Sequence, residues 1–102
     1  MGPSPYDVSN EAQDDLFNIW RRIADDSVEL ADRIESEFYG LFETLGKMPG
    51  LGHPRRDLTK RHVLFFGLYS FLVVYEPDAR PIRIVAVLRG KRNVKRILRE
   101  RP

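Results

Sequence analysis

The second half of the sequence concentrates cationic side chains. Residues 53–102 hold thirteen Lys and Arg against four Asp and Glu, whereas residues 1–52 hold four against eleven. The overall charge of +2 therefore divides into −7 for the first half and +9 for the second. From Pro81 onward, eight cationic residues accompany Glu100 as the single acidic one. This asymmetry steers an anionic partner toward the C-terminal end.

The cationic residues that flank the predicted strands form a candidate binding site. Its members are Arg55, Arg56, Lys60, Arg61, Arg83, Arg89 and Arg92. A guanidinium can bind a phosphate or a carboxylate through two hydrogen bonds, and a nearby ring such as Tyr69 or Tyr75 can stack on a base. RNA, DNA and an acidic protein segment are therefore all suitable partners. The competing interpretations are a basic surface that only confers solubility and two tyrosines that only pack within the sheet.

The sequence lacks the residue patterns that other kinds of functional site require. The two histidines, His53 and His62, fit no zinc spacing without cysteine, so we predict no metal. Val85 stands where a phosphate-binding loop ending at Lys91 would need glycine, and no serine elbow of a hydrolase is present. The acidic pairs 14–15 and 25–26 are adjacent in sequence and point in different directions on a helix, which disfavours paired acid–base catalysis. We predict no cofactor.

The composition favours one domain in a reducing compartment. A chain of 102 residues with 42% hydrophobic residues can close one small core, so we expect a single domain over residues 1–102. The absence of cysteine suits the cytoplasm. The first residues lack the apolar run of a signal peptide, and no stretch approaches the roughly 20 apolar residues of a membrane span. We therefore expect a cytoplasmic protein without a membrane segment.

Two amphipathic helices are predicted in the acidic half. The first begins at a capping box of Asn10 and Gln13, and its apolar residues are Ala12, Leu16, Ile19, Trp20 and Ile23. Residues 14, 15, 21 and 22 are expected on its solvated face. The second begins at a capping box of Asp26 and Glu29 and runs for about nineteen residues to a C-terminal cap at Gly46. Its apolar stripe is Ala31, Ile34, Phe38, Leu41, Phe42 and Leu45. The short connection between the helices predicts an antiparallel hairpin.

The residue pattern of the basic half predicts a β-sheet. After a loop over residues 46–61, β-branched and aromatic runs predict strands at 62–66, 69–75 and 82–88 in an antiparallel meander. In the last strand, the even positions from Ile82 to Leu88 are expected to face the core, with Arg83 and Arg89 on the opposite face. Residues 6–8 form a short N-terminal strand, and apolar residues after Gly90 predict a short C-terminal helix. The predicted fold class is α+β, with the helical hairpin packed on an antiparallel sheet of three to four strands.

A resemblance to a known family extends over nearly the whole chain. The order and spacing of the residues given next, more than any single motif, support this resemblance. The residues are Tyr6-Asp7-Val8-Ser9, Ala12, Asp15-Leu16 and Ile19; Ala31 and Ile34; Leu45, Met48-Pro49, Gly52 and Arg56-Asp57-Leu58; Tyr69 and Val74-Tyr75; Ile84 to Leu88, Gly90 and Arg92. The chain resembles the ParE toxins of bacterial type II toxin–antitoxin modules, within the ParE/RelE superfamily. It departs from them at Arg89, where the family often has His, and at Asn93, where it often has Asp.

The resemblance implies one of two toxic activities. RelE-like members cut mRNA on the ribosome, which requires a base, an acid and cations for the phosphorane charge. Residues 91–102 contain no Tyr, His, Asp or Glu except Glu100, so this set is incomplete. ParE-like members inhibit DNA gyrase by binding, without catalytic residues, and we favour this function. The alternatives are an mRNA endonuclease that uses Lys60, Arg61, His62, Arg89 and Arg92, and a degenerate member that only binds an antitoxin.

The family also implies an antitoxin partner in a hetero-oligomer. A ParD-like antitoxin would lay an amphipathic helix on the helical hairpin and extend toward the basic sheet. The antitoxin-binding candidates are Phe17, Trp20, Phe38, Phe42, Arg61 and Tyr69. The gyrase-binding candidates are Arg55, Arg56, Arg83, Arg89, Lys91 and Arg92. The aromatic residues of the first set have a competing interpretation as core.

Overall fold

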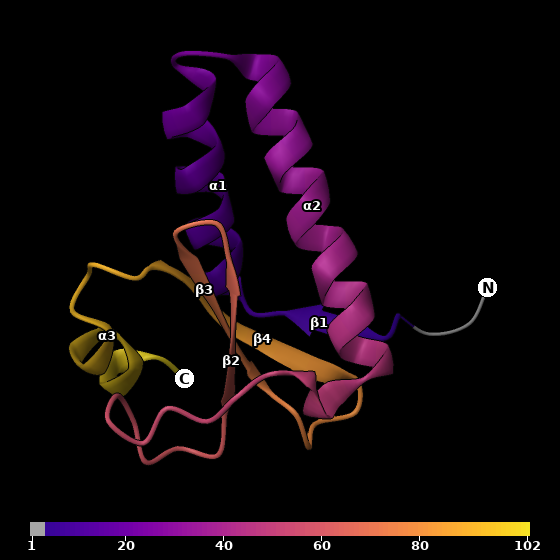
Figure 1. Ribbon diagram of the computed structural model, residues 1–102, viewed down its shortest axis with the longest axis vertical. Helices are drawn as coiled ribbons and strands as arrows, with labels where there is room; N and C mark the ends of the chain where they lie inside the picture. Colours follow the sequence, from indigo (N-terminus) through magenta and orange to yellow (C-terminus); the bar gives the residue numbers. More distant parts are fainter. Residues whose placement is uncertain (1–3) are drawn as a thin grey trace.

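A helical hairpin lies across one face of a four-stranded sheet, and a short helix covers the other face (Figure 1). The computed structural model describes residues 4–102. In chain order the elements are β1 (Tyr6–Val8), α1 (Asn10–Ala24), α2 (Val28–Lys47), the 3-10 turn η1 (Pro49–Leu51), β2 (Leu64–Leu68), β3 (Phe71–Glu76), β4 (Ile82–Arg89) and α3 (Val94–Glu100). The predicted α+β class is confirmed. Among the described residues, no helix is both long and apolar enough to cross a membrane.

The strand order in the sheet is β1-β4-β3-β2. β2, β3 and β4 form the predicted antiparallel meander, and β1 joins the free side of β4 in parallel. The two predicted strand starts at residues 62 and 69 are each two residues too early. Tyr69 and Ser70 instead make the turn between β2 and β3, where Tyr69 adopts a φ of 56°.

β4 contains a bulge that exchanges its two faces part-way along. Tyr75 of β3 pairs with Ile84 while Val74 pairs with Ala86, so Val85 is one residue more than β3 can match. Before the bulge, even-numbered Ile84 packs toward the helical hairpin; after it, odd-numbered Val87 does. Val85, Ala86 and Leu88 pack with α3 on the other side. The expectation of a single even-numbered core face is therefore wrong, and Arg83 and Arg89 lie on opposite faces of the sheet.

Serine, not the neighbouring Asn or Asp, caps each long helix. Ser9 precedes α1 in an extended conformation, and its Oγ accepts the backbone N–H of Ala12 at 3.1 Å. Ser27 does the same before α2, where it accepts the N–H of Leu30 at 3.1 Å. The predicted capping boxes at Asn10 and Asp26 are each one residue out of place. Ser9 is itself buried, and its Oγ donates to the carbonyl of Val85 in β4 at 3.3 Å. The cap of α1 therefore also joins the helix to the sheet.

Gly46 lies inside α2, one residue before its end, so its predicted role as a C-terminal cap is wrong. A Cβ at this position would lie 2.5 Å from the carbonyl oxygen of Pro5. The glycine therefore lets the chain that leads into β1 cross directly over the last turn of α2.

Tyr75 fixes the start of the long connection between η1 and β2. Its side chain is fully buried in β3, and its hydroxyl donates to the carbonyl of Pro49 at 2.7 Å while accepting the N–H of Gly52 at 2.9 Å. A Cβ on Gly52 would lie 2.7 Å from that hydroxyl, so only glycine allows this approach. The segment predicted as a loop is thus tied to the sheet, and Tyr75 packs within it.

We expect Tyr75→Phe to lower the free energy of unfolding by about 1–3 kcal/mol, because the buried N–H of Gly52 and the carbonyl of Pro49 both lose their partner. Urea unfolding followed by circular dichroism measures this loss. Tyr69→Phe is the matched control, since it removes a hydroxyl from a side chain that is 64% exposed, and we expect a change within about 0.5 kcal/mol. Equal losses in the two variants would contradict a structural role for the Tyr75 hydroxyl.

Candidate functional site

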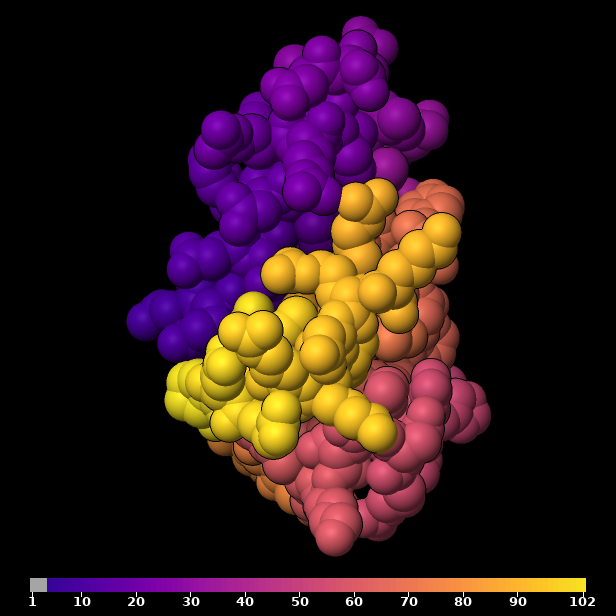
Figure 2. Space-filling view, turned by 90° about the vertical axis from the view of Figure 1, so that its left-hand side faces the viewer, coloured from indigo at the N-terminus to yellow at the C-terminus, as the bar shows by residue number. Residues whose placement is uncertain are grey.

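An open cleft of about 650 Å³ separates α1 from the end of the sheet where β3 begins and β4 ends. Its lining includes Asp15, Asn18, Ile19, Arg21, Arg22, Ile23 and Asp25 from α1 and the turn after it, and Phe71, Val87, Arg89 and Arg92 from the sheet and beyond. Figure 2 looks onto this side of the molecule, where the connection between β4 and α3, in orange, projects beside the indigo hairpin. The cleft volume lies within the range of about 300–1,000 Å³ found for ligand sites.

A tight turn brings two of the predicted cationic residues into the cleft. The N–H of Gly90 donates to the carbonyl of Ser70 at 3.1 Å, and the N–H of Arg92 donates to the carbonyl of Arg89 at 3.0 Å. Asn93 then begins α3, because its Oδ1 accepts the N–H of Arg96 at 3.2 Å. Asn at this position keeps the capping function that Asp would have. Arg89 and Arg92 therefore both line the cleft, with the exposed Lys91 between them.

The opposite wall of the cleft carries two arginines that the sequence pattern assigned to a solvated helix face. Arg21 and Arg22 belong to the last turn of α1 and are exposed, as predicted, but they face the end of β4 across the cleft. Helical periodicity separates buried from exposed positions and carries no information on which exposed residues lie opposite another element. No signal in the sequence identified these two residues.

Asp15 is a further residue that was expected on the solvated face, and this expectation is wrong. Its side chain is 10% exposed and forms a two-pronged ion pair with Arg101, both N–O distances being 2.8 Å. It also accepts the backbone N–H of Val87 at 2.9 Å. Hydrogen bonds to Asp15 raise the pKa of the Arg101 guanidinium above its usual value. Asp15 thus joins α1 to β4 and to the C-terminal segment, and Arg101 balances its charge.

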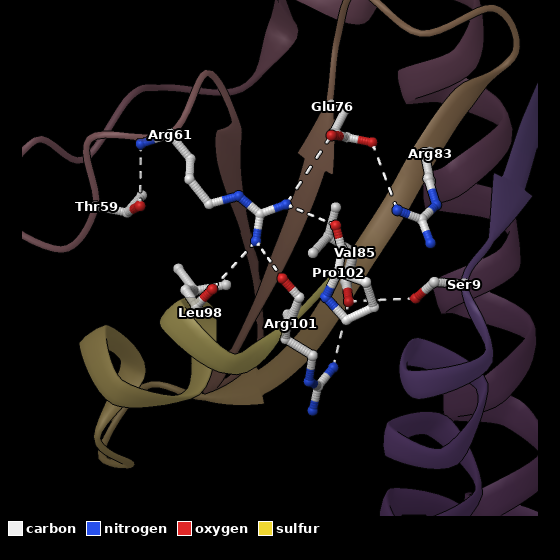
Figure 3. Close-up of polar contacts among 9 residues, drawn as sticks. All are labelled: Ser9, Thr59, Arg61, Glu76, Arg83, Val85, Leu98, Arg101 and Pro102. Atoms are coloured by element: carbon white, nitrogen blue, oxygen red, sulfur yellow. Dashed lines mark hydrogen bonds and ion pairs between the residues drawn. The ribbon is translucent and has the colours of Figure 1, made fainter.

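Arg61 and Arg83 lie away from the cleft, in a network that holds the C-terminal segment (Figure 3). Glu76 lies between them, 4.0 Å from Arg61 and 3.8 Å from Arg83. The Arg61 guanidinium also donates to the backbone carbonyls of Leu98, Arg101 and Pro102 at 3.0–3.2 Å. These contacts within the chain therefore occupy both terminal nitrogens of the Arg61 guanidinium.

The remaining predicted residues are also distant from the cleft. Arg55 and Arg56 are exposed in the segment between η1 and β2, which Figure 1 shows beside α3. Arg55 forms an ion pair with Asp57 at 2.8 Å, and these contacts lower the pKa of Asp57 and raise that of Arg55. The exposed His62 pairs with Asp78 at 2.7 Å. Of the six gyrase-binding candidates, the structure brings together only Arg89, Lys91 and Arg92.

The comparison with family models matches residues 6–94 to the ParE toxin of the type II toxin–antitoxin system, parDE. This chain belongs to the ParE toxin family. The match confirms the resemblance and makes the protein the toxin component of a type II toxin–antitoxin system, with an antitoxin protein as its partner. A search of curated proteins found no match. The matched range contains every residue named around the cleft, whereas Arg101 lies beyond it.

The aromatic residues predicted to bind an antitoxin differ sharply in exposure. Phe38 and Phe42 are 1% and 0% exposed in the core between hairpin and sheet, so the expectation that they present a surface groove is wrong. Trp20 is half-buried, and its Nε1 donates to Asp32 of α2 at 2.8 Å. Phe17 and Tyr69 are 58% and 64% exposed. Only these two present most of their ring to a partner of this ParE toxin.

The side chain of Tyr69, whose hydroxyl could transfer a proton, is engaged by another residue of the chain. Tyr69 lies in the turn beside Gly90, but its hydroxyl donates to Glu37 of α2 at 2.6 Å, and this hydrogen bond raises its pKa. Within residues 4–102, no three His, Asp or Glu side chains come together as metal ligands would. Four arginines line the cleft of this ParE toxin, and their guanidiniums can bind negatively charged groups.

Proposed function

We propose that this toxin inhibits DNA gyrase by binding to it, that it is not an enzyme, and that a ParD-like antitoxin neutralises it. The observation that carries the proposal is the make-up of the cleft. Among the described residues, its ionisable groups are four guanidiniums and two carboxylates. Arginine stays protonated at neutral pH and cannot act as an acid or a base, so a partner can be held here without being cleaved.

The two carboxylates do not supply the missing catalytic pair. Asp15 is engaged by Arg101 and by the N–H of Val87, and Asp25 is a single exposed carboxylate beyond the end of α1. RNA cleavage through the 2′-hydroxyl needs an acid and a base that act together on one phosphate. Two other residues with suitable chemistry, Tyr69 and His62, are paired with Glu37 and Asp78. These arrangements favour binding over mRNA cleavage.

The exposed aromatic rings support the antitoxin part of the proposal. Phe17 on α1 and Tyr69 in the β2–β3 turn are anchors for the apolar side chains of an amphipathic antitoxin helix. In this proposal the toxin and the antitoxin form a hetero-oligomer, and the buried core of the toxin is unchanged. Because gyrase acts on chromosomal DNA, the proposed target places the action of the toxin in the cytoplasm.

Two purified assays separate the proposal from its main alternative. We expect the protein to reduce the supercoiling of relaxed plasmid by gyrase in a dose-dependent manner and to leave mRNA intact on programmed ribosomes. Addition of the cognate antitoxin is the control and should restore supercoiling. Unimpaired supercoiling together with codon-dependent mRNA cuts would instead assign the endonuclease activity. Loss of both effects, with antitoxin binding retained, would identify a degenerate family member.

A further inference from the structure

We infer that the cleft binds a short acidic peptide segment that carries a large apolar side chain. The inference names the chemistry of the segment. It rests on the proposed function only in taking DNA gyrase as the protein that supplies this segment. Three features of the cleft carry it: an excess of positive charge on the rims, an apolar floor between the rims, and an acidic surface immediately outside.

The first feature is the charge of the two rims. Arg21 and Arg22 lie on one rim and Arg89 and Arg92 on the other, and within residues 4–102 none of the four forms an ion pair. Of the two carboxylates in the lining, Asp15 is paired with Arg101 through both of its oxygens, and Asp25 forms no ion pair with any of the four arginines and offsets at most one of their charges. Four like charges around one cleft repel each other, so an anionic occupant relieves this repulsion and gains charge-assisted hydrogen bonds.

The second feature is the floor between the rims. Ile19 and Ile23 of α1 and Phe71 and Val87 of the sheet line it. The ring of Phe71 packs edge-on against Phe38 of the core, with centroids 5.6 Å apart, which fixes its position. A large apolar side chain seated on this floor is shielded from water while acidic groups on either side of it reach the arginines. Buried apolar anchors surrounded by polar contacts are the usual source of binding energy in peptide recognition.

The third feature decides between a peptide and a nucleic acid. Residues 1–52, which include the hairpin, carry the net charge of −7, and Asp14 and Asp26 are exposed on α1 and on the turn after it. A long polyanion that leaves the cleft along α1 would be repelled by these carboxylates, whereas a short segment ends before it meets them. A phosphate backbone also has no apolar group to place on the floor. The observations therefore favour an acidic peptide.

A fluorescein-labelled peptide of eight residues, Asp-Glu-Leu-Phe-Glu-Asp-Gly-Ser, is the probe for this site. We expect saturable binding in fluorescence anisotropy that weakens as NaCl is raised. Arg22→Gln and Arg92→Gln, one on each rim, should each weaken binding about tenfold, the value of one charge-assisted hydrogen bond. Arg99→Gln is the matched control, since this arginine is exposed on α3 outside the cleft, and it should bind like the wild type. A peptide with Ser in place of Leu and Phe should bind more weakly.

Three results would overturn the inference. The first is an equal loss of peptide affinity in Arg99→Gln and in the cleft variants, which would indicate general charge attraction. The second is equal affinity for the original and the Ser-substituted peptide. The third is a single-stranded oligonucleotide of the same charge that binds more tightly than the peptide and displaces it. The assay contains no gyrase, so its failure is distinct from that of the proposed function. Gyrase inhibition without peptide binding refutes only the inference, and peptide binding without gyrase inhibition refutes only the target.

Discussion

Replacement of both Arg89 and Arg92 by glutamate is expected to abolish growth arrest by the toxin and to weaken gyrase inhibition by at least about a hundredfold. The double substitution changes the charge of the cleft by four units, so the rim formed by β4 and its connection to α3 would repel the acidic groups it is proposed to hold. Like charges brought together at an interface cost several kcal/mol, and each 1.4 kcal/mol is a factor of ten in affinity.

Growth after induced expression and the supercoiling assay measure this effect. Both arginines are exposed, so the variant should keep the circular dichroism spectrum and the thermal midpoint of the wild type to within a few degrees. Lys95→Glu with Arg99→Glu is the matched control, because it makes the same change of charge at exposed positions of α3 outside the cleft. Persistent toxicity in a folded Arg89→Glu, Arg92→Glu protein would remove the cleft from the mechanism.

Asp15→Asn is expected to lower the free energy of unfolding by about 2–4 kcal/mol. Asparagine keeps an oxygen for the N–H of Val87 but removes the charge that balances Arg101, whose side chain is only 15% exposed. The larger part of the loss therefore comes from leaving a nearly buried guanidinium without its partner. Urea unfolding measures the change, and Asp14→Asn, at the exposed neighbouring carboxylate, should stay within about 0.5 kcal/mol.

A double-mutant cycle tests whether the loss belongs to the ion pair. Arg101→Gln should cost a similar amount, and the double variant with Asp15→Asn should cost clearly less than the two single losses added together, because the second substitution has no ion pair left to break. Additive losses would show that the residues act independently. In that case Asp15 would contribute through Val87 alone.

Local periodicity was sufficient to predict the two helices and the meander. The apolar stripes from Leu16 to Ile23 and from Ala31 to Leu45 are set by a repeat that any amphipathic helix must have. The helix starts were missed by one residue because Ser9 stands next to Asn10 and Ser27 next to Asp26, and these residue types have similar capping preferences. The contact of Ser9 with the carbonyl of Val85 joins residues far apart in the sequence, which no local pattern contains.

The bulge in β4 was not predictable for a related reason. Val85 and Val87 are as apolar as their even-numbered neighbours, so a two-residue period cannot locate one additional residue in the strand. The same limit affected the candidate sites. Helical spacing places Phe38 and Phe42 on one face of α2 but does not say that the sheet covers that face. Arg21 and Arg22 were missed because the cleft exists only once α1 lies beside the end of β4.

The bulge at Val85 absorbs one residue of β4 without changing the direction of the residues that follow it. Because Tyr75 pairs with Ile84 and Val74 with Ala86, deletion of Val85 would keep both pairings and give a regular strand. Val87 would still face the helical hairpin and Leu88 the side that α3 covers. A homologue with one residue fewer in β4 would thus present its basic turn to the same side of the molecule. For relatives of this toxin, an alignment gap at the bulge is therefore compatible with an unchanged direction of the arginines that follow.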